Sequence, residues 1–300
     1  MMNPASLLQL QLMTQKCTLG CPVLDRCLGG GIPCNSLTEL VGESGSGKTQ
    51  FCLQLVLAAQ LPPSRGGLYG SSFYIYTEFP FPKKRLRELC SKFRSSHKDL
   101  FPSDGSNGDD PCDRVLIQGV STADKLFEEM RTIESYLVHS KSRLPIRVIV
   151  IDSIAALFRS DFDNTPLDLK RRSSLFFKIS GKLKWLAKRF GLAVVVTNQV
   201  VDVIGANEGI NGLRIGNLAY LYSSGRRVCP ALGLGWASCV NSRLFLSRNE
   251  ETSWVNEGGV VYQRSNTKRR ISVVFAPHLP ECSCEFEIHE KGVSGVEWRQ

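Results

Sequence analysis

Residues 37–60 read LTELVGESGSGKTQFCLQLVLAAQ. The segment Leu37–Val41 predicts a strand, and Thr49–Gln60 predicts a helix that is apolar on most sides and therefore buried. Between them, Gly42–Thr49 fits the pattern G-x-x-x-x-G-K-[ST]. A strand before this pattern and a helix after it are the context that a phosphate-binding loop requires. A glycine-rich turn with an incidental lysine is the alternative, and the matched context disfavours it.

The types of residue in this loop suit a nucleotide. Glycines let backbone N–H groups converge on phosphate oxygens, and the helix N-terminus adds its dipole. Lys48 can reach the β- and γ-phosphates, and the Thr49 hydroxyl can bind Mg²⁺. We therefore predict that ATP and Mg²⁺ are the cofactors, and that the nucleotide contacts are Gly42, Glu43, Ser44, Gly45, Ser46, Gly47, Lys48 and Thr49.

Outward from the loop, strand and helix patterns alternate. The chain predicts strands at 73–76 and 115–117, buried strands at 148–151 and 193–196, and helices at 83–94, 122–138 and around 175–190. Shorter strands are predicted at 244–246, 271–275 and 285–288. This alternation predicts an α/β fold with a mainly parallel central sheet, helices on both faces and a short antiparallel C-terminal extension. We divide the chain into a short N-terminal arm, 1–35, and one domain, 36–300.

Polar residues follow three of the predicted strands. Asp152 ends 148–151 and is expected near Mg²⁺, with capping of the next segment as the alternative. Glu78 follows 73–76, at the sheet edge where ligands bind in open α/β folds, and could orient a water. Gln199 follows 193–196 and could sense the γ-phosphate. Each of these two assignments has an equally favoured alternative: Glu78 as an ordinary surface glutamate, and Gln199 as a hydrogen-bonding residue at the end of a strand.

Composition sets the broad class. The 300 residues are 42% hydrophobic and 22% charged, which excludes wholesale disorder, and the net charge of +9 suits a polyanionic partner. The eleven cysteines include no Cys-x-x-Cys pair, so zinc-site spacing is missing and a disulfide scaffold is not expected. No apolar run approaches the roughly 18 residues of a membrane span. We expect a soluble, reduced, intracellular protein without a membrane partner.

These motifs together resemble a RecA-type recombinase core. The resemblance rests on Thr38-Glu39 before the loop, Gln50 after it, Tyr76-Thr77-Glu78, VIVIDSIAALF at 148–158 and Thr197-Asn198-Gln199-Val200, and it covers residues 18 to about 295. It implies a RecA-like P-loop ATPase domain in which Glu78 is catalytic and Gln199 couples ATP to a DNA loop. It also implies that ATP bridges the phosphate loop and a neighbouring subunit.

Four further stretches resemble one branch of the eukaryotic recombinase paralogues. They are 30–33 (GGIP), 77–86 (TEFPFPKKRL), 158–162 (FRSDF) and 230–237 (PALGLGWA). This branch implies homologous recombination repair of double-strand breaks and crosslinks, including meiotic intermediates. Its implied partners are DNA, single-stranded or branched, a C-type recombinase paralogue and the main strand-exchange recombinase. The implied location is the nucleus, with the cytoplasm as a second compartment.

The chain also departs from the main recombinase. Only about 35 residues precede the core, which leaves no room for that protein's N-terminal helical DNA-binding domain, and no Phe-x-x-Ala peptide occurs there. The stretch 275–280 (FAPHLP) lacks the adenine-capping Asp. We therefore expect no independent long filament and a different turnover of ATP.

In this fold, two loops are expected to face DNA. The first is 159–172, ending in Lys170, Arg171 and Arg172, and the second is the glycine-rich 201–232, with Arg214, Arg226 and Arg227. Arginine can neutralise phosphates, and the tyrosines of the second loop can stack on bases. Ordinary solvated loops are the alternative.

Three functions remain open. The favoured one is an ATP- and DNA-binding recombinase paralogue with at most weak DNA-dependent ATP hydrolysis. The first rival is a non-catalytic adaptor that uses the core as an interaction module. The second is a small-molecule P-loop kinase, which the lack of an acceptor-binding insert after the loop disfavours.

Overall fold

A nine-stranded sheet organises the part of the chain that the structure describes. The computed structural model describes residues 14–78, 80–101, 110–139, 144–159, 165–203, 221–257 and 260–297. The strand order is β14-β13-β12-β11-β3-β7-β6-β4-β5. Six neighbouring strands run parallel: β11 (Ser242–Glu257), β3 (Ser36–Gly42), β7 (Ala193–Asn198), β6 (Ile146–Asp152), β4 (Ser71–Tyr76) and β5 (Val115–Gly119).

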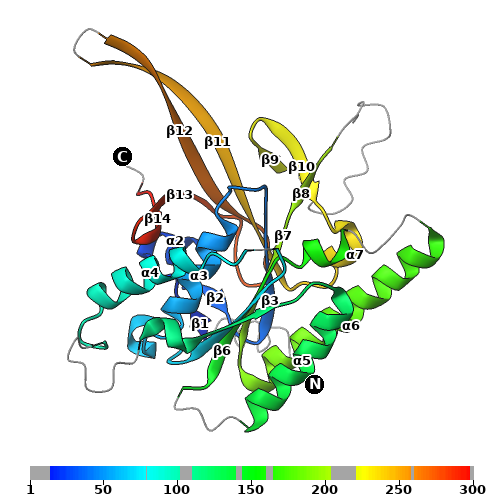
Figure 1. The fold of residues 1–300 in the computed structure, drawn as a ribbon. Helices are drawn as coiled ribbons and strands as arrows, with labels where there is room; N and C mark the ends of the chain where they lie inside the picture. Colours follow the sequence, from blue (N-terminus) through cyan, green and yellow to red (C-terminus); the bar gives the residue numbers. More distant parts are fainter. Residues whose placement is uncertain are drawn as a thin grey trace.

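Helices cover both faces of this sheet, as predicted (Figure 1). One face carries α2 (Pro22–Cys27), α3 (Lys48–Ala58) and α4 (Lys83–Ser96). The other carries α5 (Ala123–His139), α6 (Pro166–Phe190) and α7 (Gly233–Ala237). Short 3₁₀ helices lie at Pro63–Arg65, Pro111–Arg114 and Ala155–Phe158. Within the described residues, no helix combines the length and apolar character needed to cross a bilayer.

The inner strands β3, β7, β6 and β4 are buried, which is why they are largely apolar, whereas the edge strand β5 is mostly exposed. Along β6, Val148 and Val150 pack into the cluster under α3, whereas Ile149 and Ile151 pack into the cluster under α6. Successive side chains of a strand point to opposite faces, so an inner strand such as β6 contributes to both clusters. The predicted α/β fold with a mainly parallel sheet is confirmed.

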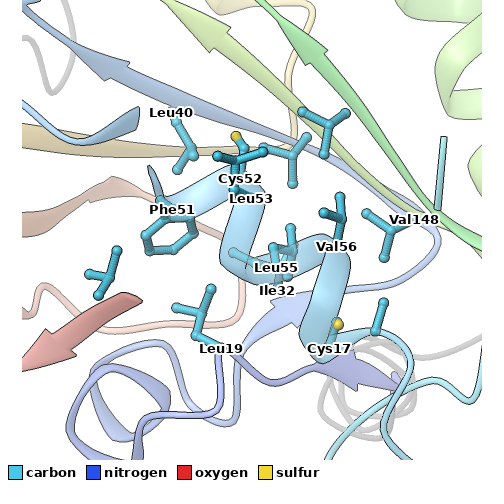
Figure 2. Packing of buried hydrophobic residues seen from close by; sticks show 14 of the residues in the cluster. Cys17, Leu19, Ile32, Leu40, Phe51, Cys52, Leu53, Leu55, Val56 and Val148 are labelled. Atoms are coloured by element: carbon cyan, nitrogen blue, oxygen red, sulfur yellow. The ribbon is translucent and has the colours of Figure 1, made fainter. Parts of the chain in front are cut away.

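Helix α3 is the centre of the larger cluster (Figure 2). Phe51, Leu53, Leu55 and Val56 are each at most 1% exposed. A helix surrounded on nearly all sides has no polar stripe, as its sequence indicates. Its dense packing fixes the position of the phosphate loop that precedes it.

The described part of the predicted arm packs onto this same cluster. Strand β1 (Lys16–Cys17) pairs with β2 (Ile32–Pro33), and Leu19, Leu24 and Leu28 are at most 1% exposed. A side chain at Gly31 would overlap the Cys17 carbonyl oxygen, 2.1 Å from an added Cβ, so this close approach requires glycine. The division into arm and domain stays a prediction.

The antiparallel part is present but longer than predicted. Strand β11 pairs with β12 (Val260–Phe275), which pairs with β13 (Ser283–His289), and β13 pairs with β14 (Gly292–Gly295). Both β11 and β12 have 16 residues, and their hairpin projects from the body of the molecule (Figure 1). The outer parts of these strands are rich in polar residues, so they lack the hydrophobic pattern from which strands are predicted.

One pair of cysteines departs from the expectation of a reduced chain. Cys90 on α4 and Cys112 form a disulfide with their Cα atoms 6.0 Å apart. The other nine cysteines are free, and most are buried, as apolar packing predicts. The physical reason is tertiary: the fold brings together two cysteines separated by 22 positions.

Candidate nucleotide-binding site

A pocket of about 300 Å³ lies at the carboxyl edge of the parallel strands. It collects residues from the phosphate loop, from the ends of β6 and β7 and from the segment after β4. The lining residues are Ser44, Gly45, Gly47, Lys48, Thr49, Gln50, Glu78, Asp152, Ser153, Gln199 and Ile288. Candidate residues spread over more than 150 positions of sequence therefore share one cavity.

The phosphate loop joins β3 to α3, as predicted. Gly47 precedes the helix with φ +107°, a backbone conformation that residues with a side chain rarely adopt. An added Cβ would also lie 3.2 Å from atoms of Phe286 and Ile288. Among the described residues, no side chain caps the N-terminus of α3. Its first residues, Lys48 and Thr49, line the pocket, and an uncapped helix N-terminus is suited to bind an anion.

Lys48 is held at the base of this loop. Its Nζ donates to the carbonyl oxygens of Gly42 at 2.7 Å and Glu43 at 2.9 Å. Burial lowers the pKa of Lys48, while the nearby carboxylates of Asp152 and Glu78 oppose that shift. A largely buried ammonium beside an uncapped helix N-terminus is a strong attractor for phosphate.

Asp152 ends β6 and accepts three hydroxyl hydrogen bonds. Thr49 Oγ1 and Tyr74 OH each donate to Oδ2 at 2.7 Å, and Thr197 Oγ1 donates to Oδ1 at 2.6 Å. The peptide bond that follows, to Ser153, is cis. The predicted metal-side pair, Thr49 and Asp152, is therefore in direct contact.

Glu78 and Gln199 are in contact as well. Gln199 Nε2 donates to both carboxylate oxygens of Glu78, at 3.1 and 3.2 Å. Arg159 joins them: its Nη2 donates to Gln199 Oε1, and its Nη1 lies 3.7 Å from Glu78 Oε1. Sequence reasoning did not assign a role to Arg159, although it lies in the FRSDF stretch that carries part of the resemblance. The signal available was its position shortly after the strand that ends at Asp152.

Three of the predicted nucleotide contacts, Gly42, Glu43 and Ser46, are not among the residues that line the pocket, and the Glu43 side chain is bound elsewhere. It accepts hydrogen bonds from Ser223 and Ser224, at 2.6 and 2.5 Å, and from Arg226 at 3.0 Å. Only its carbonyl oxygen faces Lys48. Burial raises the pKa of Glu43, but the hydroxyls and the nearby Arg248 and Arg226 outweigh it and lower the pKa overall.

The residues present fit ATP and Mg²⁺. The loop offers uncapped N–H groups and a buried ammonium for phosphate oxygens, and Thr49 with Asp152 offers two oxygen groups for a hard cation. Ser46 Oγ is buried and has no hydrogen-bond partner among the described residues. Lys48 and Thr49 would hold the nucleotide and the ion, with Asp152 behind Thr49.

The first group of predicted DNA contacts belongs to a helix and not to a loop. Lys170, Arg171 and Arg172 lie in α6, whose N-cap Thr165 accepts from the Asp168 N–H. Lys170 is exposed, and Arg171 forms an ion pair with Asp124 of α5 at 3.3 Å. Arg172 stacks on the Phe176 ring, 5.3 Å from its centroid, and burial lowers its pKa. The capping residues, which were not identified as such, start the helix earlier than predicted.

The second group lies partly in a small antiparallel sheet. The described ends of that predicted loop form β8 (Val200–Asp202), β9 (Leu221–Ser223) and β10 (Arg226–Pro230), in the order β8-β10-β9. Arg226 is held by Asp202 and Glu43, at 2.8 and 3.0 Å, and Arg227 is half-buried. Arg214 lies outside the described residues.

Comparison with known proteins identifies the family. The family model for Rad51 matches residues 11–213, more than half of the chain. An Arabidopsis thaliana protein named DNA repair protein XRCC3 homolog is 52% identical, with 98% of each chain covered. DNA repair protein XRCC3 of Mus musculus is 35% identical over 94% of this chain and 76% of that protein, and its Bos taurus counterpart is 34% identical over 94% and 75%.

These relatives confirm the branch indicated by GGIP, TEFPFPKKRL, FRSDF and PALGLGWA, which is that of X-ray repair cross-complementing protein 3. The site geometry and the matches agree on the same core. The chain belongs to the Rad51 family and is a RecA-type recombinase paralogue similar to XRCC3.

Proposed function

We propose that this chain is a Mg²⁺–ATP- and DNA-binding recombinase paralogue that acts in homologous recombination repair of double-strand breaks and crosslinks, meiotic intermediates included. The names of its relatives support a role in DNA repair and recombination. The observation that best supports nucleotide binding is the pocket, which is lined by the phosphate loop together with Glu78, Asp152 and Gln199.

Each residue of the pocket has a distinct task in this proposal. Lys48 and the N-terminus of α3 hold phosphate oxygens, and Thr49, backed by Asp152, orients the metal ion. Glu78 orients a water, and Gln199 connects the pocket to β8, which begins at the next residue. When bound, Mg²⁺–ATP supplies the phosphoanhydride bond and the charge that the loop neutralises.

The proposed setting is a heteromeric complex in the nucleus, with a C-type recombinase paralogue as direct partner and the main strand-exchange recombinase as the protein assisted. The family supports paralogue assembly at that coarse level. The excess of positive charge, +9, suits DNA as a further partner.

The test of the nucleotide assignment is the Lys48→Ala variant. Removing a buried ammonium from the phosphate loop should weaken binding of a fluorescent ATP analogue by about tenfold or more. Lys178→Ala, which removes an exposed lysine from α6, is the matched control and should bind like the wild type. Equal affinity for Lys48→Ala and wild type would remove the assignment.

The contacts of Glu78 also support the alternative function, that of a non-catalytic adaptor. The Glu78 carboxylate is already engaged by Gln199 and lies near the Arg159 guanidinium, so its contacts are also those of a purely structural residue. As an adaptor, the chain would bind ATP as a structural ligand and would not depend on Glu78 for repair.

A further inference from the structure

The geometry points to Glu43 as a positioning residue that couples the phosphate loop to the β9–β10 hairpin, and this rests on the proposed ATP binding. The coupling makes nucleotide occupancy and closure of the hairpin favour each other. The hairpin lies at one end of the predicted second DNA loop, so the coupled element is the one that the proposed DNA function would use.

The first step is the set of contacts around the Glu43 carboxylate. This side chain is 9% exposed and receives Ser223 Oγ and Ser224 Oγ on one oxygen and Arg226 Nη2 on the other. Arg248 Nε of β11 lies 3.5 Å from it. A carboxylate that is largely removed from water with charged and hydroxyl donors on both oxygens is an energetically important link.

The second step is that the main chain of the same residue contacts Lys48, which lines the nucleotide pocket. The Glu43 carbonyl oxygen accepts from Lys48 Nζ, and Ser44 lines the pocket. Glu43 therefore cannot change its backbone position without changing both the Lys48 contact and the hairpin contact. Two sites that share one residue of this kind are coupled, and the coupling is reciprocal.

The third step is the shape of the hairpin turn. Ser224 and Gly225 have φ values of +51° and +71°, and a non-glycine residue in this region is strained. Ser224 N donates to the Arg248 carbonyl oxygen at 2.7 Å, and Arg248 N donates to Ser223 Oγ at 3.0 Å. The turn is thus held in place by β11 and Glu43 together.

The fourth step is that the hairpin meets the pocket a second time. Arg226 also binds Asp202 of β8, and Ala231 N donates to the carbonyl oxygen of Gln199 at 2.8 Å. Gln199, which lines the pocket, and Glu43, which holds Lys48, are therefore both joined to the sheet β8-β10-β9. Ordering the phosphate loop with a ligand lowers the entropy cost of ordering this sheet, so the sign of the coupling is positive.

Amide hydrogen exchange on the full chain, with and without Mg²⁺–ATP, tests this link. In the wild type, ATP should slow exchange of peptides covering 221–230 by about fivefold or more, the lower end of typical coupling. In Glu43→Gln, measured at an ATP concentration that saturates the variant, this slowing should fall below about twofold.

Two further variants separate the link from general damage. Ser223→Ala combined with Ser224→Gly removes the hydroxyls without touching the phosphate loop and keeps the turn conformation. It should lose the same protection and bind the fluorescent ATP analogue severalfold more weakly. Glu250→Gln is the matched control, because Glu250 is exposed and lies near Arg248 without contacting Glu43.

The outcomes distinguish this inference from the function on which it rests. Protection of 42–49 by ATP with no change at 221–230 in the wild type would overturn the coupling and leave ATP binding intact. Protection at 221–230 that is the same in Glu43→Gln and wild type would also overturn it. Absence of protection at 42–49 in the wild type would remove the proposed ATP binding itself, and the coupling with it.

Discussion

At the scale of single residues, Asp152 connects the elements around the pocket, because three hydroxyl groups donate hydrogen bonds to its carboxylate. Tyr74→Phe removes one of them from a partly buried carboxylate. A hydrogen bond to a charged group is worth about 1.5–3 kcal/mol, so the free energy of unfolding in urea should fall by that amount. Tyr136→Phe on the exposed side of α5 is the control and should change little. Equal losses in both variants would contradict this role of Tyr74.

The same tyrosine carries a pH dependence. Burial and the neighbouring Asp152 charge raise the pKa of Tyr74 well above its ordinary value of 10.0. The folded state therefore holds this proton more tightly than the unfolded chain does. The resulting stability is complete below the unfolded pKa and is lost as the pH rises above about 10. The difference in unfolding free energy between wild type and Tyr74→Phe should shrink over that interval, and a difference that grows there would be inconsistent with this assignment.

Glu78 decides between the catalytic and the adaptor interpretations. Glu78→Gln keeps the shape of the side chain and its contact with Gln199 but removes the base. If Glu78 orients water, single-turnover ATP hydrolysis should fall by about 10²-fold or more while ATP affinity stays within a few-fold. Glu88→Gln, a partly exposed glutamate of α4, is the matched control. Unchanged hydrolysis, or repair that survives Glu78→Gln in cells, would favour the adaptor.

At the scale of elements, a buried ion pair joins the strands that support the phosphate loop. Glu39 of β3 accepts from Arg243 Nε of β11 at 2.5 Å and from Asn198 Nδ2 of β7 at 2.7 Å, and both charged side chains are at most 2% exposed. Removing one charge leaves the other uncompensated. Glu39→Ala should therefore cost about 3–5 kcal/mol in unfolding free energy.

A double variant sharpens that prediction. Glu39→Leu with Arg243→Met removes both charges and retains apolar volume, so it should recover most of the stability lost in Glu39→Ala. Chemical unfolding of the two variants measures the recovery. A double variant as unstable as the single one would show that packing, and not the uncompensated charge, dominates at this position.

Prediction from sequence worked best for elements that are buried on every side. The strand 148–151 and the helix of the phosphate loop have unbroken apolar patterns, and both occur as β6 and α3. It worked poorly for β11 and β12, because strands with polar side chains on both faces carry no periodic hydrophobic signal. The early start of α6 was missed because the cap at Thr165 was not used as a helix signal.

At the scale of the molecule, the strand order explains which site residues were predictable. Glu78, Asp152 and Gln199 follow β4, β6 and β7, which are neighbours in the sheet, so they meet at one edge. A parallel sheet guarantees this once the strands are known. The partners of Arg159 and Arg226 depend on contacts between loops and distant elements, for which local sequence has no pattern.

The predicted DNA contacts differ in whether their charge is free to bind a phosphate group or is already paired within the protein. Lys170 is exposed on α6, whereas Arg226 already lies between Asp202 and Glu43. A side chain that is neutralised within the protein adds little to counterion release from DNA. We consider binding of the full chain, together with the proposed C-type partner, to a single-stranded oligonucleotide. Lys170→Ala should reduce the slope of log affinity against log salt by about 0.7, whereas Arg226→Ala should leave it nearly unchanged. Fluorescence anisotropy at several salt concentrations measures both slopes. A flat salt response in the wild type would remove the DNA contact at α6, and a reduced slope only in Arg226→Ala would mean that DNA displaces the two carboxylates.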